Sequence, residues 1–370
     1  MIDLNWTELS FGLALFFTIA YFLYVVSFYR KCVLHPDWQQ TKGNWGLFLF
    51  SLFLIIVASN GNTSDWFSYQ QIVWNYDFGP QGVNHGEPVY AYIVKFVNKN
   101  YLLFRIIVWG GAFLLACITF KRFEVNVNVA AFVLVAAFLL KFNYARASLA
   151  MASYFLGLSF LLKPIKNLKV LSIALTALFF WGAYEFHHSL LPVLYITIMA
   201  YVPLNRFSLL VIIVLLPFVV SYLSNSIDVA SILEDESIAS KFESYTERAD
   251  GFTNFLGYIS KIIGYGSFVI PITIITLSIN KQQKKIELPM LRFYRVTIAV
   301  FLFAVSFLFM GLQSEFFIYR YLFVTFIPIS VLSTYLYENE ILSRSKFTIM
   351  VLSGICAQAF SFIVGFYHTI

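Results

Sequence analysis

The sequence predicts an all-α, polytopic membrane protein with about twelve transmembrane helices, within a range of about 10–13. Its 370 residues are 60% hydrophobic and 12% charged, whereas a soluble domain is about 25% charged. Apolar runs of about 20 residues, the length with which a helix crosses the hydrocarbon core, recur along the whole chain. These runs are continuous and do not alternate, so they favour helices over the strands of a closed barrel.

The expected spans follow these apolar runs in chain order, and polar connections of different lengths separate them. The second and fourth runs are short, and we expect those helices to tilt less or to be flanked by turns at the membrane interface. The expected spans are residues 9–29, 45–60, 101–120, 126–142, 147–162, 168–184, 189–204, 207–224, 256–279, 293–311, 319–337 and 346–366.

Alternate connections between these spans carry most of the positive charge. Short loops rich in Lys and Arg stay in the cytoplasm, so these connections are expected to face inside. The N-terminal stretch holds Asp3 and Glu8 without Lys or Arg, which predicts an outer N-terminus and, with an even number of spans, an outer C-terminus. Of the 25 Lys and Arg residues, the alternate connections hold Arg30, Lys31, Lys42, Lys121, Arg122, Lys163, Lys166, Lys169, Arg206, Lys281, Lys284, Lys285, Arg292, Arg295, Arg344 and Lys346.

The net charge of +6 therefore reflects topology and contact with anionic lipid of the bilayer, and no nucleic-acid partner is expected. Residues 1–370 are predicted to form a single integral membrane domain with two long outer loops, 61–100 and 225–255. The first has helical stretches near 65–76 and 88–98, and the second resembles a short helix pair at the membrane surface. Every inner connection is shorter, so chemistry is expected on the outer side.

Several cations lie at the outer ends of spans, against the charge bias. Arg146 lies between the fourth and fifth expected spans, and Arg320 begins the eleventh. Taken alone, each arginine is equally well explained as an anchor that extends to the interface. Two arginines flanked by Tyr, together with a His pair on the same side, favour a binding site. The guanidinium fork matches a diphosphate with two parallel hydrogen bonds.

His187 and His188 begin the seventh expected span and are candidates for a base, because the pKa of His lies near neutrality. A His at a span end is more often an interfacial or helix-capping residue. Glu234 and Glu236 have a spacing that a divalent cation could use. A solvated helix face explains this pair better, and we expect neither a metal nor another cofactor.

The order of short motifs along the chain resembles the EpsG family, a branch of the Wzy-type bacterial polysaccharide polymerases. The segment SNGNTSDWFSYQQIVW matches an early outer-loop motif of that family through Asp65 and Tyr69, and GEP follows with Glu87. The segment YARASLAMA matches a later motif through Arg146, and FHHS matches another through His187.

The last motif, Tyr-Arg-Tyr, places Tyr319 and Arg320 near the C-terminal end, and the motifs together cover about residues 45 to 335. One departure concerns an Arg that members of the family often carry before the first motif, where this chain reads VASNGN. The proposed diphosphate clamp therefore either lacks one arginine or recruits Arg105 or Arg248.

The resemblance implies a GT-C-like polymerase in the bacterial inner (cytoplasmic) membrane, with its active site and both long loops facing the periplasm or cell exterior. Donor and acceptor would be undecaprenyl-diphosphate-linked oligosaccharides, joined by one inverting, metal-independent displacement. The sequence leaves open whether a chain-length regulator (copolymerase) binds. The implied roles are catalysis by His187, diphosphate binding by Arg146 and Arg320, and substrate binding by Asp65, Tyr69, Glu87, His188 and Tyr319.

Two other functions use a similar set of helices. A flippase or transporter of lipid-linked oligosaccharides would also bind diphosphate, but it should carry polar residues near the midplane of its spans. The expected spans are nearly free of charge there, which favours an enzyme working at one face. A membrane acyltransferase usually presents its His to a cytoplasmic donor, whereas His187 and His188 are expected outside.

Overall fold

The computed structural model contains helices joined by turns, without strands, in the part of the chain that it describes, which comprises residues 6–34, 43–57, 73, 88–140, 145–204, 255–309, 318 and 321–369. Its longer helices are joined by short 3-10 or π segments, labelled η. In chain order the elements are α1 (Trp6–Tyr29), η1 (Arg30–Leu34), α3 (Trp45–Val57), α5 (Pro88–Val97), α6 (Tyr101–Arg105), η4 (Ile106–Gly110), α7 (Gly111–Arg122), α8 (Val127–Phe138), α9 (Ala145–Leu162), α10 (Lys169–Phe186), η6 (His188–Leu190), α11 (Leu191–Ile196), η7 (Thr197–Ala200), α16 (Phe255–Gln282), η9 (Gln283–Lys285), α17 (Leu288–Phe309), α19 (Phe326–Glu338) and α20 (Arg344–Thr369).

Seven of the described helices are long and apolar enough to cross a membrane, in agreement with the prediction of a polytopic membrane protein. They are Leu15–Leu34, Tyr101–Arg122, Lys169–Phe186, Ile262–Lys285, Leu288–Ser306, Tyr321–Glu338 and Arg344–Phe362. Shorter apolar helices cover Trp45–Val57, Val127–Phe138, Ala147–Leu162 and Leu191–Ala200. The short helix expected at 88–98 is present as α5, while the expected span 207–224 lies outside the described residues.

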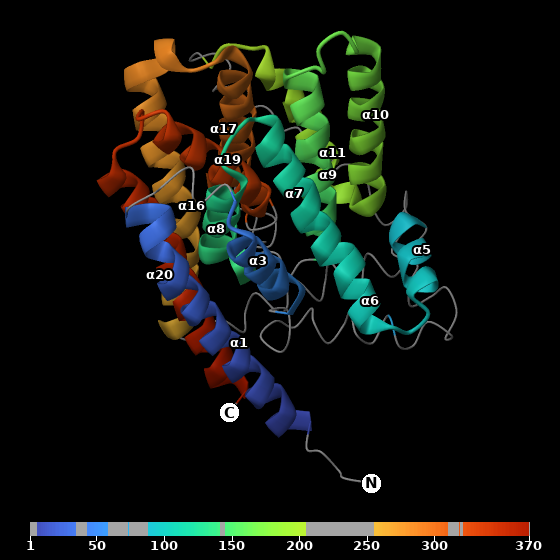
Figure 1. The fold of residues 1–370 in the computed structure, drawn as a ribbon, viewed down its shortest axis with the longest axis vertical. Coiled ribbons are helices and arrows are strands. Elements are labelled where there is room, and N and C mark those ends of the chain that lie inside the picture. The colour runs from blue at the N-terminus through green and yellow to red at the C-terminus, as the bar shows by residue number, and fades with distance from the viewer. Residues whose placement is uncertain are drawn as a thin grey trace.

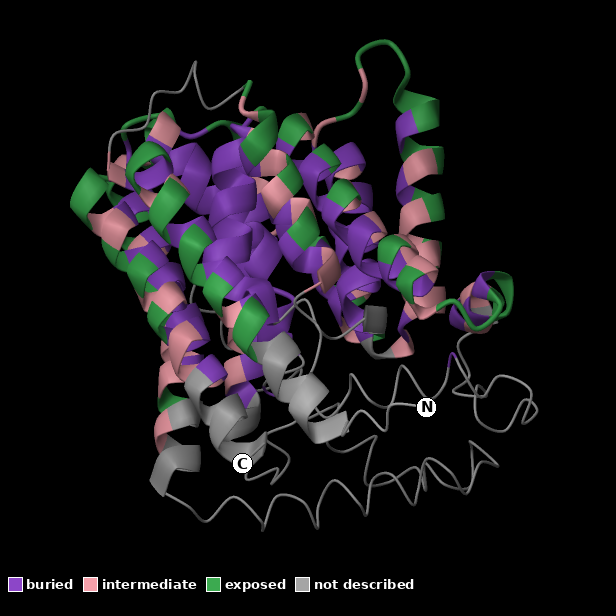
Figure 2. Ribbon diagram, turned by 60° about the horizontal axis from the view of Figure 1, so that its bottom comes forward, coloured by how far each residue is buried: buried purple, intermediate pink, exposed green. Residues whose placement is uncertain are grey.

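Helices α8 and α19 form the centre of the bundle (Figure 1). Every residue from 128 to 138 in α8 and from 326 to 337 in α19 is buried. The helices around them bury one side and expose large apolar side chains such as Val26 and Val170 on the other (Figure 2). An exposed apolar exterior around a packed centre is what a helix bundle in lipid requires.

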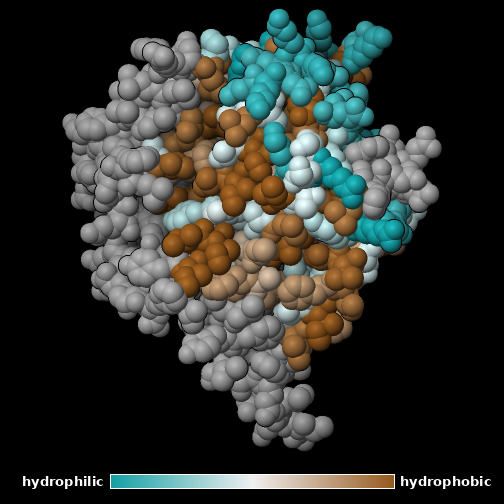
Figure 3. Space-filling model, turned by 90° about the vertical axis from the view of Figure 1, so that its left-hand side faces the viewer, coloured by the Kyte–Doolittle hydropathy of each residue, from teal (hydrophilic) through white to brown (hydrophobic). Residues whose placement is uncertain are grey.

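The two ends of the bundle differ in polarity. The connections that follow α7, α9, α16 and α19 all lie at the upper end in Figure 1, whereas α1 begins and α20 ends at the lower end. On the face seen in Figure 3, hydrophilic residues gather at the upper end, above a wide hydrophobic surface. We call the upper end the basic end, because the described Lys and Arg residues of the predicted inner connections lie there.

The start of α17 differs from the prediction. Helix α17 begins at Leu288 and not near residue 293, so Arg292 and Arg295 belong to its first turns and not to the preceding connection. The guanidinium of Arg292 lies over the ring of Tyr201, 4.7 Å from its centroid. This contact allows the helix to include a charged residue in its first turns, because the arginine covers an aromatic face while it stays near the basic end.

The short central helix α8 is held by side chains from distant parts of the chain. At its start the backbone N–H of Asn126 donates to both carboxylate oxygens of Glu338, each at 3.1 Å. At its other end the Tyr21 hydroxyl donates to the carbonyl of Ala136 at 2.6 Å. The buried amide of Gln358 donates to the carbonyl of Ala137 at 3.1 Å and accepts from the N–H of Leu140 at 2.8 Å.

A close approach between α20 and α8 brings Gln358 within reach of these groups. A Cβ atom added at Gly354 would lie 2.6 Å from the Cα of Ala137, a separation at which the backbones must shift. Small residues at helix crossings allow such contacts in membrane proteins. Glycine is therefore required at 354 for steric reasons.

We expect Gly354→Ala to lower the stability of the protein by about 1–3 kcal/mol, because the added methyl group forces α20 away from α8. The matched control is Gly182→Ala in α10, where an added Cβ would meet nothing within 4 Å. That change should leave stability unaltered or raise it by up to about 1 kcal/mol through helix propensity. Thermal unfolding in detergent measures both, and equal melting temperatures for the two variants would contradict the crossing described above.

Candidate functional site

Helices α9 and α10 form an antiparallel hairpin that carries two of the predicted site residues. Gly157 in α9 allows close contact, because a Cβ atom there would lie 2.8 Å from the ring of Phe180. The Thr176 hydroxyl of α10 donates to the carbonyl of Gly157 at 3.3 Å. The ring of Tyr154 stacks on Phe180 with centroids 5.3 Å apart. These contacts fix the register of the two helices.

This register places the backbones of Arg146 and His187 at the same height along the hairpin. Arg146 precedes Gly157 by eleven residues in α9, and His187 follows Thr176 by eleven residues in α10. At 1.5 Å per residue, both lie about 16 Å along the axis from the Gly157–Thr176 contact. Packed helices lie about 8–10 Å apart. Arg146 therefore lies in the first turn of α9, and His187 directly follows α10. Both lie on the side of the bundle opposite the basic end.

His187 ends α10 in an extended conformation, with φ −161° and ψ 98°. Its backbone N–H donates to the carbonyls of Ala183 and Tyr184, each at 3.1 Å, and its own carbonyl accepts from Leu190 at 3.0 Å. The residue is buried. Its imidazole is thus held at a rigid corner between α10 and the following turn, and not on an exposed loop.

His188 has a different environment from its neighbour. It begins η6, is half-buried, and stacks on the ring of Tyr184 with centroids 4.5 Å apart. The sequence does not distinguish the two histidines, but the structure does. His187 is enclosed by the bundle, whereas His188 presents a stacked imidazole at its edge.

The hairpin is tied to the next helix by one buried polar contact. The Tyr154 hydroxyl lies 2.8 Å from the hydroxyl of Thr197 and donates to the carbonyl of Val193 at 3.4 Å. This contact joins α9 to α11 and η7, the elements that follow His187 and His188. The turn containing both histidines is therefore supported from both sides.

Aromatic packing also brings the end of α8 next to the start of α19. The Phe138 ring lies 6.3 Å from that of Phe326 and 5.4 Å from that of Phe268, which in turn lies 6.0 Å from Phe323. Tyr321 is buried against Phe303, with centroids 4.9 Å apart. The segment that ends at Phe138, before Arg146, and the segment that begins at Tyr321, after Tyr319–Arg320, therefore lie in the same part of the bundle.

The structure describes only some of the predicted site residues. For Arg146 it describes the backbone, in the first turn of α9, but not the side chain. The positions outside the described residues are Asp65, Tyr69, Glu87, Tyr319 and Arg320, together with Arg248. In the part of the chain that is described, no group of three or more His, Cys, Asp or Glu side chains could hold a metal ion.

Arg105 is a buried arginine at the same end of the bundle. It is 4% exposed, and its guanidinium lies 5.8 Å from the ring centroid of Tyr101 and 5.6 Å from that of Trp109. The π-helical segment η4, which contains Trp109, follows it directly. Such segments often accompany functional sites. The sequence predicts Arg105 only as a substitute cation, and it indicates no role for Gln358, whose importance depends on a partner far away in the chain.

The profile of the EpsG family matches residues 44–370, which is nearly the whole chain. This chain belongs to the EpsG family. The match includes α9, α10 and the turn with both histidines. The family is associated with glycosyltransferase-like polymerases that act in exopolysaccharide synthesis. No curated protein and no solved structure matches the chain.

The hairpin register predicts which engineered cysteines can be joined in this EpsG-family protein. In a background without Cys32, Cys117 and Cys356, the pair Arg146→Cys and Glu185→Cys should be linked by a short bis-maleimide. The control pair, Arg146→Cys and Ile173→Cys, is offset by about 21 Å along the axis and should not be linked. Gel mobility after cleavage between α9 and α10 measures the linkage, and equal linkage of both pairs would refute this register.

Proposed function

We propose that this protein is a Wzy-type repeat-unit polymerase that joins undecaprenyl-diphosphate-linked oligosaccharides at the outer face of the cytoplasmic membrane. Two observations support the proposal. The chain belongs to the EpsG family over residues 44–370, and the hairpin register sets the backbones of Arg146 and His187 level with each other. The charge bias assigns the basic end to the cytoplasm. Both residues lie at the opposite end of the bundle.

The proposed reaction is a single displacement at the anomeric carbon of the growing glycan. A hydroxyl oxygen of the incoming repeat unit forms the new bond to this carbon, while the bond to the lipid diphosphate breaks and its electron pair stays on the diphosphate oxygen. Attack from the face opposite the leaving group inverts the anomeric configuration. His187 accepts the hydroxyl proton.

The diphosphate is already a good leaving group, so the reaction needs cations for the departing charge more than it needs a strong acid. Arg146 and Arg320 fill this role, because a guanidinium stays protonated and matches diphosphate oxygens in pairs. No metal is required for this step. The level position of Arg146 and His187 suits the reaction, since leaving group and base act on opposite sides of one carbon.

The remaining predicted residues surround the acceptor and donor sugars. Asp65 and Glu87 orient the acceptor sugar or the base, and Tyr69 and Tyr319 offer aromatic faces and hydroxyls. His188, stacked on Tyr184 at the edge of the bundle, contacts the substrate without accepting its proton. A lipid-linked substrate reaches such a site laterally from the bilayer, between helices.

The polysaccharide ladder of a strain that lacks this protein tests the proposal. Without the protein we expect lipid capped with single repeats, and wild-type protein should restore the ladder. His187→Phe keeps a ring but removes the base, with an expected loss of about 10²–10⁴ in rate. Arg146→Lys and Arg320→Ala should each lose about 10²–10³, because lysine lacks the paired donors and alanine lacks the charge.

Two comparisons make this test specific. His188→Phe preserves the stacking on Tyr184 and should shorten the ladder far less than His187→Phe does. Lys166→Gln, at the exposed basic end, should leave the ladder unaltered. Full ladders from an inserted Arg146→Ala, Arg320→Ala double variant would refute the clamp. A null strain without single repeats at the outer face would instead favour the flippase.

A further inference from the structure

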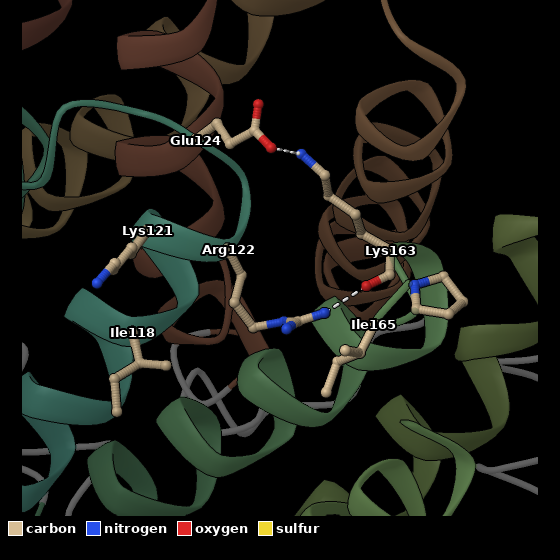
Figure 4. A pocket seen from close by; sticks show the side chains of 7 residues that line it. Ile118, Lys121, Arg122, Glu124, Lys163 and Ile165 are labelled. Atoms are coloured by element: carbon tan, nitrogen blue, oxygen red, sulfur yellow. Dashed lines mark hydrogen bonds and ion pairs between the residues drawn. The ribbon is translucent and has the colours of Figure 1, made fainter. Parts of the chain in front are cut away.

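A pocket of about 360 Å³ lies at the basic end, far from the candidate site, where α7 and α9 end side by side (Figure 4). Its charged lining comprises Lys121 and Arg122 from α7, Glu124 from the following turn, and Lys163 from the end of α9. Three cations and one carboxylate leave this pocket with two positive charges in excess. The charge balance favours an anion.

Arg122 is fixed in position by three kinds of contact. Its Nε–H donates to the Ser159 hydroxyl at 2.8 Å, and a terminal N–H donates to the carbonyl of Lys163. Its guanidinium lies 3.8 Å from the ring centroid of Phe160. It therefore binds the last carbonyls of α9 and keeps its charge at the pocket without the entropy cost of ordering a mobile side chain.

The two lysines have different surroundings. Lys163 Nζ lies 2.6 Å from a carboxylate oxygen of Glu124, on the upper side of the pocket in Figure 4. Lys121 is exposed and extends from α7 away from that ion pair. Glu124 is 72% exposed, so solvent weakens its hold on Lys163. Both ammonium groups therefore have capacity to bind an incoming anion.

The other side of the pocket is apolar and continues onto the surface that faces lipid. Ile118 and Ile165 line it. Ile118 is 45% exposed, and Leu114, one turn earlier in α7, is 46% exposed. A ligand that fits this surface has an anionic head for the cations and an apolar tail for the stripe of α7. A free phosphate would leave the apolar lining without a partner.

We propose that this pocket binds the phosphate headgroup of an anionic phospholipid, with an acyl chain along Ile118 and Leu114. This proposal rests on cations that lie beside an exposed apolar stripe. It does not depend on the polymerase activity. Basic pockets at the ends of membrane helices are suited to such headgroups. The bound lipid joins the end of α7 to the end of α9 and so stabilises the hairpin whose other end carries Arg146 and His187.

The test compares lipid binding by two charge-matched variants of the full chain. Lys121→Gln with Lys163→Gln removes two charges from the pocket. Lys284→Gln with Lys285→Gln removes two from the exposed segment η9, at the same end of the bundle but away from the pocket lining. Native mass spectrometry and thermal shifts are recorded with added phosphatidylglycerol, phosphatidylcholine or inorganic phosphate.

Wild-type protein and the η9 variant should retain phosphatidylglycerol and gain thermal stability from it, but not from phosphatidylcholine. The pocket variant should bind it about 30-fold more weakly. Unaltered binding by the pocket variant, or equal losses in both variants, would overturn the proposal, as would equal stabilisation by inorganic phosphate. If the double variant fails to fold, Lys121→Glu decides the question, because Lys121 is exposed and lies outside the Arg122 contacts. This substitution reverses one charge and should weaken lipid binding at least as much.

Discussion

The hydrogen bonds at the end of α8 are the constraint on which the rest of the bundle depends. Twelve helical residues extend about 18 Å, which is well short of a hydrocarbon core of about 30 Å. An unsatisfied backbone group in that environment costs several kcal/mol. Gln358 supplies both a donor and an acceptor there, and Tyr21 supplies another donor. Helices α1 and α20 must therefore pack directly against α8, and the glycine at 354 permits it.

The next described helix, α9, begins above the lower ends of α1 and α20 (Figure 1). The first turn of α9 carries Arg146, and the hairpin register brings His187 to the same height. The other end of the same hairpin borders the pocket proposed for a lipid headgroup. There Arg122 donates to the carbonyl of Lys163, just after α9, beside the proposed lipid pocket. One helix pair thus connects the proposed lipid pocket at the basic end with the site proposed for a lipid diphosphate.

The helical fold could be predicted from the sequence because continuous apolar runs permit few alternatives in a membrane. The contact at the end of α8 could not, since the residue that accepts from the N–H of Leu140 lies 218 positions later in the chain. Arg146 and His187 stand out in the sequence as polar residues at span ends, and their matching offsets from Gly157 and Thr176 explain why their backbones lie level with each other. The sequence does not separate His187 from His188. That distinction depends on tertiary burial and on stacking with Tyr184.

The most direct measurement uses purified protein in vesicles with a synthetic oligosaccharide linked to undecaprenyl diphosphate. Glycan length and released undecaprenyl diphosphate are followed together, with the substrate on the face opposite the basic end. The account predicts one diphosphate released for each repeat added, with no added metal, and loss of both signals in His187→Phe. Transfer of the intact lipid-linked substrate across the bilayer, without diphosphate release or chain growth, would contradict it.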